Sequence, residues 1–350
     1  MNRKTWCLLT LGALIMGFSL LSAIVIFIDP FQIYRKAELY LPPIDNQTQV
    51  YSNAGIVRQY DYDSIVVGTS VTENFRPSQM DSVLGGRFIK LCSSAGTAYN
   101  HAILMDLALR THDVQRVVYG LDVYSFINGL DETGTAMPMY LYDDNLFNDA
   151  AYWLNRSVLA SFLPRCLRTW GQQQTDALRD SMYAWKDQYI YGPDALWDVV
   201  FKAPESRKNP GEFIETAHEN LETHLIPFIK LNPDIQFDIF FPPYSAAEWA
   251  KMEGNGTFDA LLTLRRLCYE RLSGFANVRI FDFSAKEEWV TDINNYKDPL
   301  HYGPWINDAI TECIAAGENL VTDAAQIEAA DAQLRTWVDM QISTGRWPFY

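Results

Sequence analysis

The chain has little positive charge. Lysine and arginine number 28 among 350 residues, against 43 aspartates and glutamates, which gives a formal net charge of −15. Nucleic-acid-binding proteins neutralise phosphates with Lys- and Arg-rich faces, so this balance argues against a nucleic-acid partner. The sequence also lacks the Cys/His spacing of a zinc site and a glycine-rich phosphate loop. We therefore expect neither a metal nor a cofactor.

Cysteine is scarce as well. Cys7 lies in an apolar N-terminal run, and Cys92, Cys166, Cys268 and Cys313 are widely spaced. Most lie inside apolar segments, so we expect buried free thiols, while a disulfide stays open because pairing does not follow from sequence. There is no internal repeat. With 48% hydrophobic and 20% charged residues, the composition is that of a globular protein with a sizeable core.

A long apolar run is present at the N-terminus. Residues 5–28 carry no charged side chain, and a helix of that length spans roughly 36 Å, enough to cross a bilayer. A cleavable signal peptide has an apolar core of only about 7–15 residues followed by a small-residue cleavage site, which this run lacks. We predict an uncleaved membrane anchor over residues 1–36 that contacts lipid. A lone N-terminal anchor most often leaves the following domain outside, so we expect the globular part to be extracytoplasmic.

Beyond an expected extended stem at 29–49, short β-branched runs alternate with helical patterns. Strands are predicted at 64–68, 88–92, 116–122, 236–241 and 278–283, and helices at 97–110, 212–230, 258–272, 305–315 and 324–342. This alternation predicts an α/β fold with a five-stranded parallel sheet and right-handed crossovers. The predicted main domain covers residues 37–320 with a helical insertion at about 123–210, and 321–350 form a C-terminal helix and aromatic tail.

Candidate catalytic residues follow two of these strands. In open α/β sheets ligands bind beyond the carboxyl ends of the strands, and Ser70 directly follows the first one. A serine needs a histidine base, and the histidine needs a carboxylate that orients it. Asp298 and His301 in YKDPLHYG supply both from one loop after the last strand. Taken singly, Ser70 suits a helix N-cap and DPLH a solvated turn; together they predict a catalytic triad.

Three motifs resemble the SGNH (GDSL-type) hydrolases over about residues 64–315. They are GTS at 68–70, LCSSAGTAYN at 91–100, and D-x-x-H. The apolar N-terminus, DPF at 29–31 and DPLHYG make the chain more similar to the membrane-tethered branch, which includes teichoic-acid D-alanyl-transfer and alginate O-acetylation proteins. The resemblance implies a three-layer α/β/α sandwich of flavodoxin-like type. By position it makes Ser70 the nucleophile, His301 the base and Asp298 its partner, with the backbone N–H groups of Ser70 and Gly96 at the oxyanion.

The third block of that family departs from the pattern. Where an asparagine donates to the oxyanion, YGLDVYSF has Asp122, and a carboxylate repels an oxyanion unless it is protonated or turned away. Asn100 and Asn128 are candidate replacement donors. We also expect Asn100, Asp122 and Tyr244 as candidates to line the substrate site, although FFPPYS, which contains Tyr244, suits an ordinary strand exit equally well.

Two functions remain open at this stage. The first is a membrane-anchored, serine-dependent esterase or O-acyltransferase acting on acyl esters of a cell-envelope polysaccharide or polymer, with a polysaccharide or polyol acceptor. The resemblance implies a membrane-embedded acyl-donor protein as partner. The second is a catalytically inactive carbohydrate-binding or scaffolding module of an envelope complex, supported by the missing asparagine.

Overall fold

A computed structural model describes residues 2–185, 189–196 and 209–345 of the chain. The chain divides into two compact units. The anchor unit consists of residues 1–60 and 136–178, and the sheet unit of residues 61–135 and 179–350. Each unit has its own set of helices, and all five strands lie in the sheet unit.

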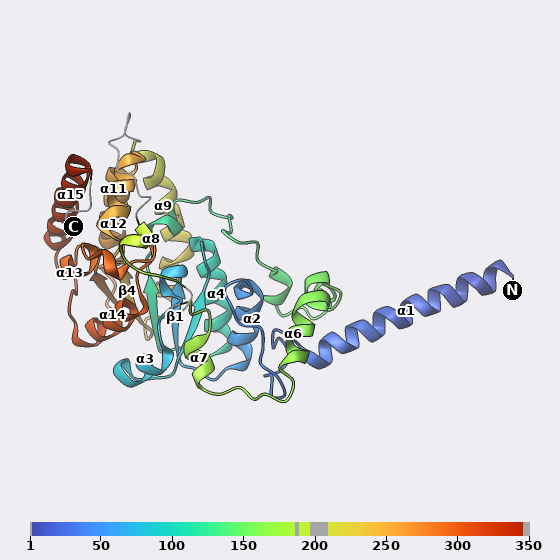
Figure 1. The fold of residues 1–350 in the computed structure, drawn as a ribbon. Coiled ribbons are helices and arrows are strands. Elements are labelled where there is room, and N and C mark those ends of the chain that lie inside the picture. Colours follow the sequence, from blue (N-terminus) through green and yellow to red (C-terminus); the bar gives the residue numbers. More distant parts are fainter. Residues whose placement is uncertain (1, 186–188, 197–208, 346–350) are drawn as a thin grey trace. The chain divides into compact units, whose positions relative to one another are not determined.

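Five parallel strands form the sheet (Figure 1). They are β1 (Ser64–Gly68), β2 (Phe88–Cys92), β3 (Arg116–Gly120), β4 (Gln236–Phe241) and β5 (Val278–Asp282), in the order β2-β1-β3-β4-β5. Ile65 of β1 lies opposite Ile89 of β2 and Val117 of β3. Every residue of β1 and β2 is buried, which explains why the sequence shows continuous apolar runs and no alternation. The predicted strands and their parallel direction are confirmed.

Helices cover both faces of this sheet and make a three-layer sandwich. Right-handed crossovers place α4 (Ala98–Thr111), α9 (Gly211–His224) and α12 (Phe258–Leu272) on one face, where they pack against each other. The other face carries α3 (Pro77–Leu84) and α14 (Pro304–Ala316), which also pack together. The order of the strands is the one found in flavodoxin-like sheets, with its reversal between β1 and β3.

The remaining elements are mostly short. In the sheet unit they are η1 (Ser70–Thr72), η2 (Val123–Phe126), α8 (Pro193–Leu196), α10 (Ile226–Leu231), α11 (Ala246–Gly254), α13 (Glu287–Val290), η6 (Ile293–Asn295) and α15 (Ala324–Thr344). The anchor unit has α1 (Arg3–Ile28), α2 (Gln49–Gln59), η3 (Met139–Leu141), α5 (Ala150–Trp153), η4 (Val158–Phe162) and α6 (Leu163–Arg168), and α7 spans Ala177–Ser181.

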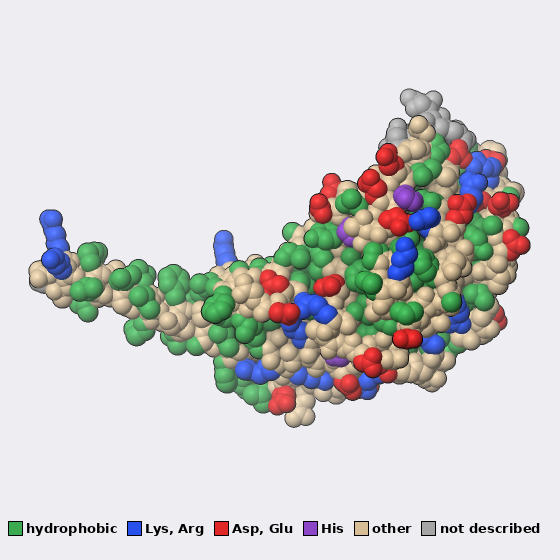
Figure 2. Space-filling model, turned by 180° about the vertical axis from the view of Figure 1, so that it is seen from behind, with side chains coloured by type: hydrophobic (Ala, Val, Ile, Leu, Met, Phe, Trp, Pro, Cys, Tyr) green, Lys and Arg blue, Asp and Glu red, His purple; other side chains and the backbone are tan. Residues whose placement is uncertain are grey.

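The last turn of α1 is part of the core of the anchor unit. Hydrophobic side chains are exposed along most of this helix (Figure 2), but Val25 is completely buried and Ile28 is 8% exposed. Ile28 packs with Ala37, Tyr40 and Cys166. The helix therefore continues directly into folded structure, and its final turn is held by apolar contacts on the anchor unit.

Residues 29–49 do not form the extended stem that we expected. Asp29 has φ 53° and ends α1, and its carboxylate accepts hydrogen bonds from the N–H groups of Ile33 (3.0 Å) and Tyr34 (2.7 Å). Phe31 is buried with its ring 5.0 Å from that of Tyr51 and 4.9 Å from that of Phe162. The expectation was wrong because the segment buries its aromatic side chains against α2 and η4, which lie outside the local pattern.

The residues of the predicted insertion at 123–210 are divided between the two units. Residues 136–178 belong to the anchor unit with the N-terminal residues, and the parts on either side belong to the sheet unit. Two stretches of the prediction, 186–188 and 197–208, lie outside the described residues.

The predicted free cysteines are confirmed: all five are free, and all except Cys7 are buried.

Candidate active site

Ser70 lies in a tight turn at the carboxyl end of β1. The strand ends at Gly68, and Ser70 begins η1, which is a single turn; the next helix, α3, starts only at Pro77. The Thr72 side chain folds back over the strand ends, and a Cβ on Gly68 would lie 2.5 Å from its methyl group, with 2.7 Å for Gly120. The turn therefore requires glycine at the ends of two neighbouring strands.

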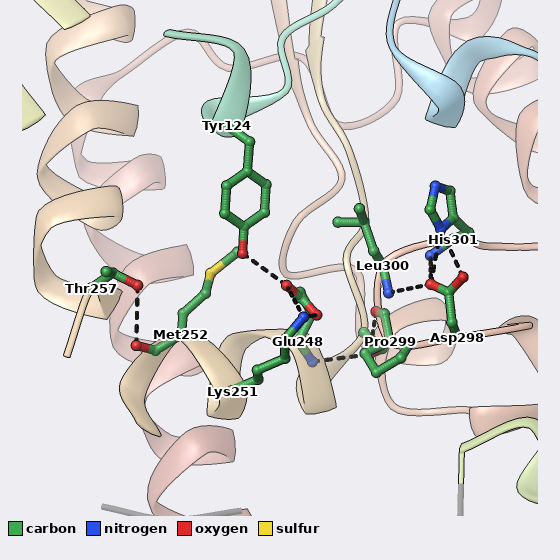
Figure 3. Close-up of polar contacts among 10 residues, drawn as sticks. Tyr124, Glu248, Lys251, Met252, Thr257, Asp298, Pro299, Leu300 and His301 are labelled. Carbon is green, nitrogen blue, oxygen red and sulfur yellow. Dashed lines mark hydrogen bonds and ion pairs between the residues drawn. The ribbon is translucent and has the colours of Figure 1, made fainter. Parts of the chain in front are cut away.

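His301 lies between β5 and α14, in a short loop whose two ends are joined by backbone hydrogen bonds. Tyr296 and Tyr302 form an antiparallel bridge, and the Lys297 N–H donates to the His301 carbonyl (3.1 Å). Inside the loop, Asp298 Oδ1 accepts hydrogen bonds from the N–H groups of Leu300 (3.0 Å) and His301 (2.9 Å), as Figure 3 shows in part. This turn, which Asp residues favour, fixes the carboxylate beside the imidazole of the residue three positions later.

The three predicted triad residues form one hydrogen-bonded line. Ser70 Oγ lies 2.7 Å from His301 Nε2, and His301 Nδ1 lies 2.8 Å from Asp298 Oδ2 and 2.9 Å from Oδ1. In Figure 3 the second ring nitrogen points away from Asp298. The His301 side chain is 20% exposed and that of Asp298 is 37% exposed, so solvent reaches this line. In this geometry His301 can receive the Ser70 proton while Asp298 fixes the ring tautomer.

A lysine ammonium also supports the carboxylate. Lys297 Nζ lies 3.1 Å from Asp298 Oδ2 and over the rings of Trp185 (4.6 Å) and Tyr189 (4.2 Å). Burial raises the pKa of Asp298, but the hydrogen bond and charge of His301 together with the Lys297 charge outweigh it, so that its pKa lies well below the usual range. Asp298 is therefore a carboxylate at any ordinary working pH.

Trp185 completes the packing around the imidazole. Its ring meets that of His301 edge to face, with centroids 5.9 Å apart, and it is 3% exposed. Its backbone N–H donates to Asn74 Oδ1 (3.1 Å), which joins it to the segment after η1. No sequence pattern indicated that Trp185, Asn74 and Lys297 belong to the site. Only the adjacency of Lys297 to Asp298 was visible in the sequence.

Two further side chains join the serine turn to the histidine loop. The Val71 carbonyl accepts hydrogen bonds from Tyr302 Oη (3.1 Å) and Asn307 Nδ2 (2.9 Å), both buried. On the other side of the loop, the Pro299 carbonyl accepts from Ser245 Oγ (2.6 Å), which lies at the start of α11. These bonds set the separation of Ser70 and His301, and no local sequence pattern indicated them.

Asp122 is turned toward neighbouring hydroxyl groups. Its carboxylate accepts from Tyr244 Oη (2.5 Å), Thr69 Oγ1 (2.8 Å) and the Tyr124 N–H (3.0 Å). Burial, followed by the negative charge of Asp122, raises the pKa of Tyr244 well above its usual value, so this tyrosine remains a neutral donor. Tyr124 in turn donates to Glu248 (2.7 Å, Figure 3). Asp122 and Tyr244 are both buried, and their predicted place in the substrate lining stays a prediction.

Two of the expected oxyanion donors have other partners in this structure. The Gly96 N–H donates to the Ser93 carbonyl (2.8 Å), and Asn128 Nδ2 donates to the Tyr124 carbonyl (2.8 Å). Asn100 lies in the first turn of α4, where its Oδ1 accepts from the Thr97 N–H (3.0 Å), while its Nδ2 is buried without a hydrogen-bond partner among the described residues. Ser70 is the first residue of η1, where an N–H has no acceptor within its own helix. The Ser70 N–H and Asn100 Nδ2 are thus the expected donors that stay available.

Comparison with known proteins finds similar structures but no similar family or curated sequence. No family model and no curated protein sequence matches the chain. A platelet-activating-factor protein from Streptococcus pneumonia has a TM-score of 0.38 at 8% identity, covering 84% of this chain and 92% of that one. A protein named as an acylhydrolase from Bacteroides fragilis has a TM-score of 0.31 at 9% identity, covering 80% and 87%. An acetyl xylan esterase from Butyrivibrio proteoclasticus has a TM-score of 0.32 at 9% identity, covering 74% and 63%.

Structural likeness does not fix a function, which depends on the side chains of the site itself. Within the described parts of the chain, no group of three His, Cys, Asp or Glu side chains is placed to hold a metal ion. The side chains at the carboxyl end of the sheet offer a hydroxyl, an imidazole and a carboxylate in line. That set suits acyl transfer through a serine.

Proposed function

We propose that this protein is a serine-dependent ester hydrolase or O-acyltransferase tethered to a membrane by α1, with Ser70, His301 and Asp298 as its catalytic triad. The supporting observation is the unbroken hydrogen-bonded line from Ser70 Oγ through His301 to Asp298. Two segments separated by 231 residues have to fold together to make it. We further propose that the substrates are acyl esters of an envelope polysaccharide or polymer.

The reaction would proceed in two balanced halves. Ser70 Oγ attacks the acyl carbonyl while its proton passes to His301 Nε2, and the oxyanion forms beside the Ser70 N–H. The C–O bond to the leaving alcohol then breaks, and that alcohol takes the proton from His301. In the second half, water or an acceptor hydroxyl gives its proton to His301 and attacks the acyl-serine. Ser70 leaves as the restored hydroxyl, and the products are an acid or a new ester.

The oxyanion site would be a weak one. Losing one donor from such a site costs about 10²–10³ in rate, and Asp122 stands where the resembled family has a donating asparagine. Hydrogen bonds from Thr69 and Tyr244 hold both carboxylate oxygens of Asp122, which reduces its repulsion without supplying a donor. This favours a slow enzyme, or a transferase that needs an acyl-donor partner in the membrane. The presence of Asp122 in place of that asparagine also supports the alternative function, an inactive carbohydrate-binding module.

The structure of the anchor unit supports a retained anchor. Val25 and Ile28 fill its core, and Asp29 is fully buried, so removal of α1 would open an apolar cavity. The helix is 26 residues long and contains no charge after Lys4, as a membrane span requires. We propose that α1 remains in the mature protein as a single membrane span, with the sheet unit on the extracytoplasmic side.

A fluorophosphonate probe tests the catalytic proposal on the full-length chain. We expect labelling of Ser70, loss of labelling in Ser70→Ala, and retention in Ser93→Ala, which removes a buried serine that also lies beyond a strand end. His301→Ala should slow labelling at least 10²-fold, because a serine without its base is a weak nucleophile. If the unaltered chain takes up no probe but binds an envelope polysaccharide, the inactive module is the better account.

A further inference from the structure

A cavity lies against the end of the membrane helix. It has a volume of about 280 Å³ and is lined by Phe27, Arg35, Lys36, Leu39, Tyr40 and Trp170, with Ile28 at its edge. All of these residues belong to the anchor unit. Nothing in the proposed chemistry of the sheet unit uses this cavity.

Its position relative to a bilayer follows from α1. Phe27 and Ile28 are the last residues of the helix and also line the cavity, so the cavity opens at the level where the helix leaves the hydrocarbon layer. The 26 residues of α1 reach about 39 Å, against a hydrocarbon thickness of about 30 Å. The difference is about 9 Å, and the last turn of α1 is buried in the anchor unit, so a spanning α1 would place its end and the cavity just beyond the hydrocarbon layer, at the level of the lipid headgroups.

The lining combines an apolar wall with positive charge. Phe27 is 63% exposed, Leu39 53% and Trp170 46%. Trp170 stacks on Tyr40 with ring centroids 6.3 Å apart. Exposed tryptophan and apolar side chains at this level are typical of protein surfaces that meet the membrane interface.

The two cations of the lining have no carboxylate partner among the described residues. The Arg35 guanidinium lies over the ring of Phe27 (5.4 Å) and the Lys36 ammonium over that of Tyr60 (4.7 Å). Both side chains are exposed, and Glu38 is the one acidic residue of the lining. Neighbouring cations above an apolar wall match the phosphate and acyl chain of a phospholipid.

The distribution of charge between the two units also favours the anchor unit as the part that meets an anionic lipid surface. The anchor unit has eight basic and seven acidic residues, which leaves 20 basic and 36 acidic residues in the sheet unit. An anionic lipid surface repels the sheet unit, so attraction to such a surface has to come from the anchor unit. Arg35 and Lys36 are the basic residues nearest the end of α1.

We propose that this juxtamembrane cavity binds the phosphate group of an anionic membrane phospholipid between Arg35 and Lys36, with an acyl chain along Phe27, Leu39 and Trp170. The proposal rests on the membrane anchoring in the proposed function, and is independent of the Ser70 chemistry. A bound lipid would hold the anchor unit against the bilayer surface by a second contact besides α1.

Native mass spectrometry of the delipidated full-length chain, titrated with phosphatidylglycerol or phosphatidylcholine, tests this site. We expect one retained lipid and a preference for phosphatidylglycerol. Arg35→Gln with Lys36→Gln should reduce that preference by about 30-fold, since each near-surface cation contributes about fivefold. The matched control is Arg156→Gln with Arg168→Gln, which removes two exposed arginines of the same unit outside the cavity. Trp170→Ala should weaken both lipids alike.

Equal loss of preference in both double variants, or no preference in the unaltered chain, would overturn the proposal. Fluorophosphonate labelling of the same samples separates it from the proposed function. Labelled protein without lipid preference contradicts the lipid site alone. Unlabelled protein that keeps a preference sensitive to Arg35 and Lys36 contradicts the triad alone.

Discussion

At the scale of single residues, Asp298 is the most strongly preorganised group of the candidate site. Its carboxylate accepts from the backbone N–H groups of Leu300 and His301, from the His301 ring and from Lys297. Both oxygens are thus fixed before any substrate binds. A carboxylate held in this way orients the imidazole without a conformational change during the reaction.

Two substitutions beside His301 should have effects of different size. Asp298→Asn keeps the shape but removes the charge that stabilises the imidazolium, and we expect the rate to fall by about 10³–10⁴. Lys297→Met removes one of four donors to Asp298, together with the charge that lies over the rings of Trp185 and Tyr189. There we expect only about a tenfold fall, as for the loss of one hydrogen bond to a charged group. The second-order rate of fluorophosphonate labelling measures both.

Equal rates for the two variants would show that Lys297, and not only Asp298, is needed to hold the ring. The unfolding midpoint in urea serves as a control, because a loss of folded protein would lower both rates together.

Asp298 should also make the stability of the fold depend on pH. Its lowered pKa stabilises the fold above the unfolded value of 3.8, and this contribution is lost as the pH falls further, whereas Asp298→Asn has none to lose.

At the scale of elements, the site depends on how η1 is joined to the segment after His301. Tyr302 and Asn307 both donate to the Val71 carbonyl, so the serine turn and the histidine loop share one acceptor. Because Asn307 lies on α14 and Tyr302 precedes it, the position of α14 on the sheet sets the distance from Ser70 Oγ to His301 Nε2.

Tyr302→Phe should weaken the connection between η1 and the histidine loop without leaving the Val71 carbonyl unpaired. The Val71 carbonyl keeps its bond from Asn307, so we expect a loss of about 1 kcal/mol in the free energy of unfolding. We expect the labelling rate to fall about tenfold, since small errors in the placement of reacting groups are costly. The matched control is Tyr119→Phe, which removes a buried hydroxyl that pairs with His101 Nδ1 (2.8 Å). It should lose at least as much stability, because His101 then has no ring hydrogen bond among the described residues, and it should keep its labelling rate. A parallel fall in the labelling rate of both variants would contradict a positioning role for Tyr302.

The attachment of α15 should depend on pH. Asp331 on this helix pairs with Arg265 of α12, which also binds Asp282 (2.5 Å), and Arg266 lies 3.4 Å away. Burial raises the pKa of Asp331 from 3.8 to about 6, and Arg265 and Arg266 only partly oppose this. The raised value favours the protonated form in the folded state. The group's stabilising contribution is therefore complete below about pH 4 and lost as the pH rises through 6.

Asp331→Asn, which is neutral at every pH, isolates this effect. We expect it to match the unaltered chain below about pH 4 and to be more stable by about 2–3 kcal/mol at pH 7–8, from a shift of roughly two pKa units. Urea unfolding at a series of pH values gives the difference curve. A variant less stable at pH 7 would mean that the pairing with Arg265 outweighs the cost of burying the charge.

The elements divide into those that the sequence predicts and those that it does not. The strands and most of the longer helices of the sheet unit were predicted to within a few residues, because continuous apolar runs and helical periodicity are local signals. The single helix expected at 212–230 is instead two helices, α9 and α10, which are separated at Leu225. Ser70, Asp298 and His301 followed from their places after strands. The fold of residues 29–60 did not, because it depends on rings such as Phe31 meeting Phe162, over a hundred positions away. The partner of the Gly96 N–H was equally hidden, since it depends on the backbone of one turn.

At the scale of the whole molecule, the chain is an acidic sheet unit joined at three points of the sequence to an anchor unit of nearly balanced charge. The anchor unit is built from residues 1–60 and 136–178, so the chain passes from it into the sheet unit, returns to it, and then enters the sheet unit a second time. A simple tether would need only one crossing. The three crossings argue that the anchor unit is a folded part in its own right, and α1 supplies part of its core.

Removal of α1 at two different points tests that architecture. A chain that starts at Ser22 keeps Val25 and Ile28, whereas one that starts at Pro30 lacks both. Burial of each of these side chains contributes about 1.5–3 kcal/mol, so we expect the second chain to lose roughly 3–6 kcal/mol of anchor-unit stability. Hydrogen exchange should show this as faster exchange in α2 and α6, with unchanged protection in β1 and β3. Equal protection in the two chains would mean that α1 is only a peripheral attachment and can be removed as a signal sequence is.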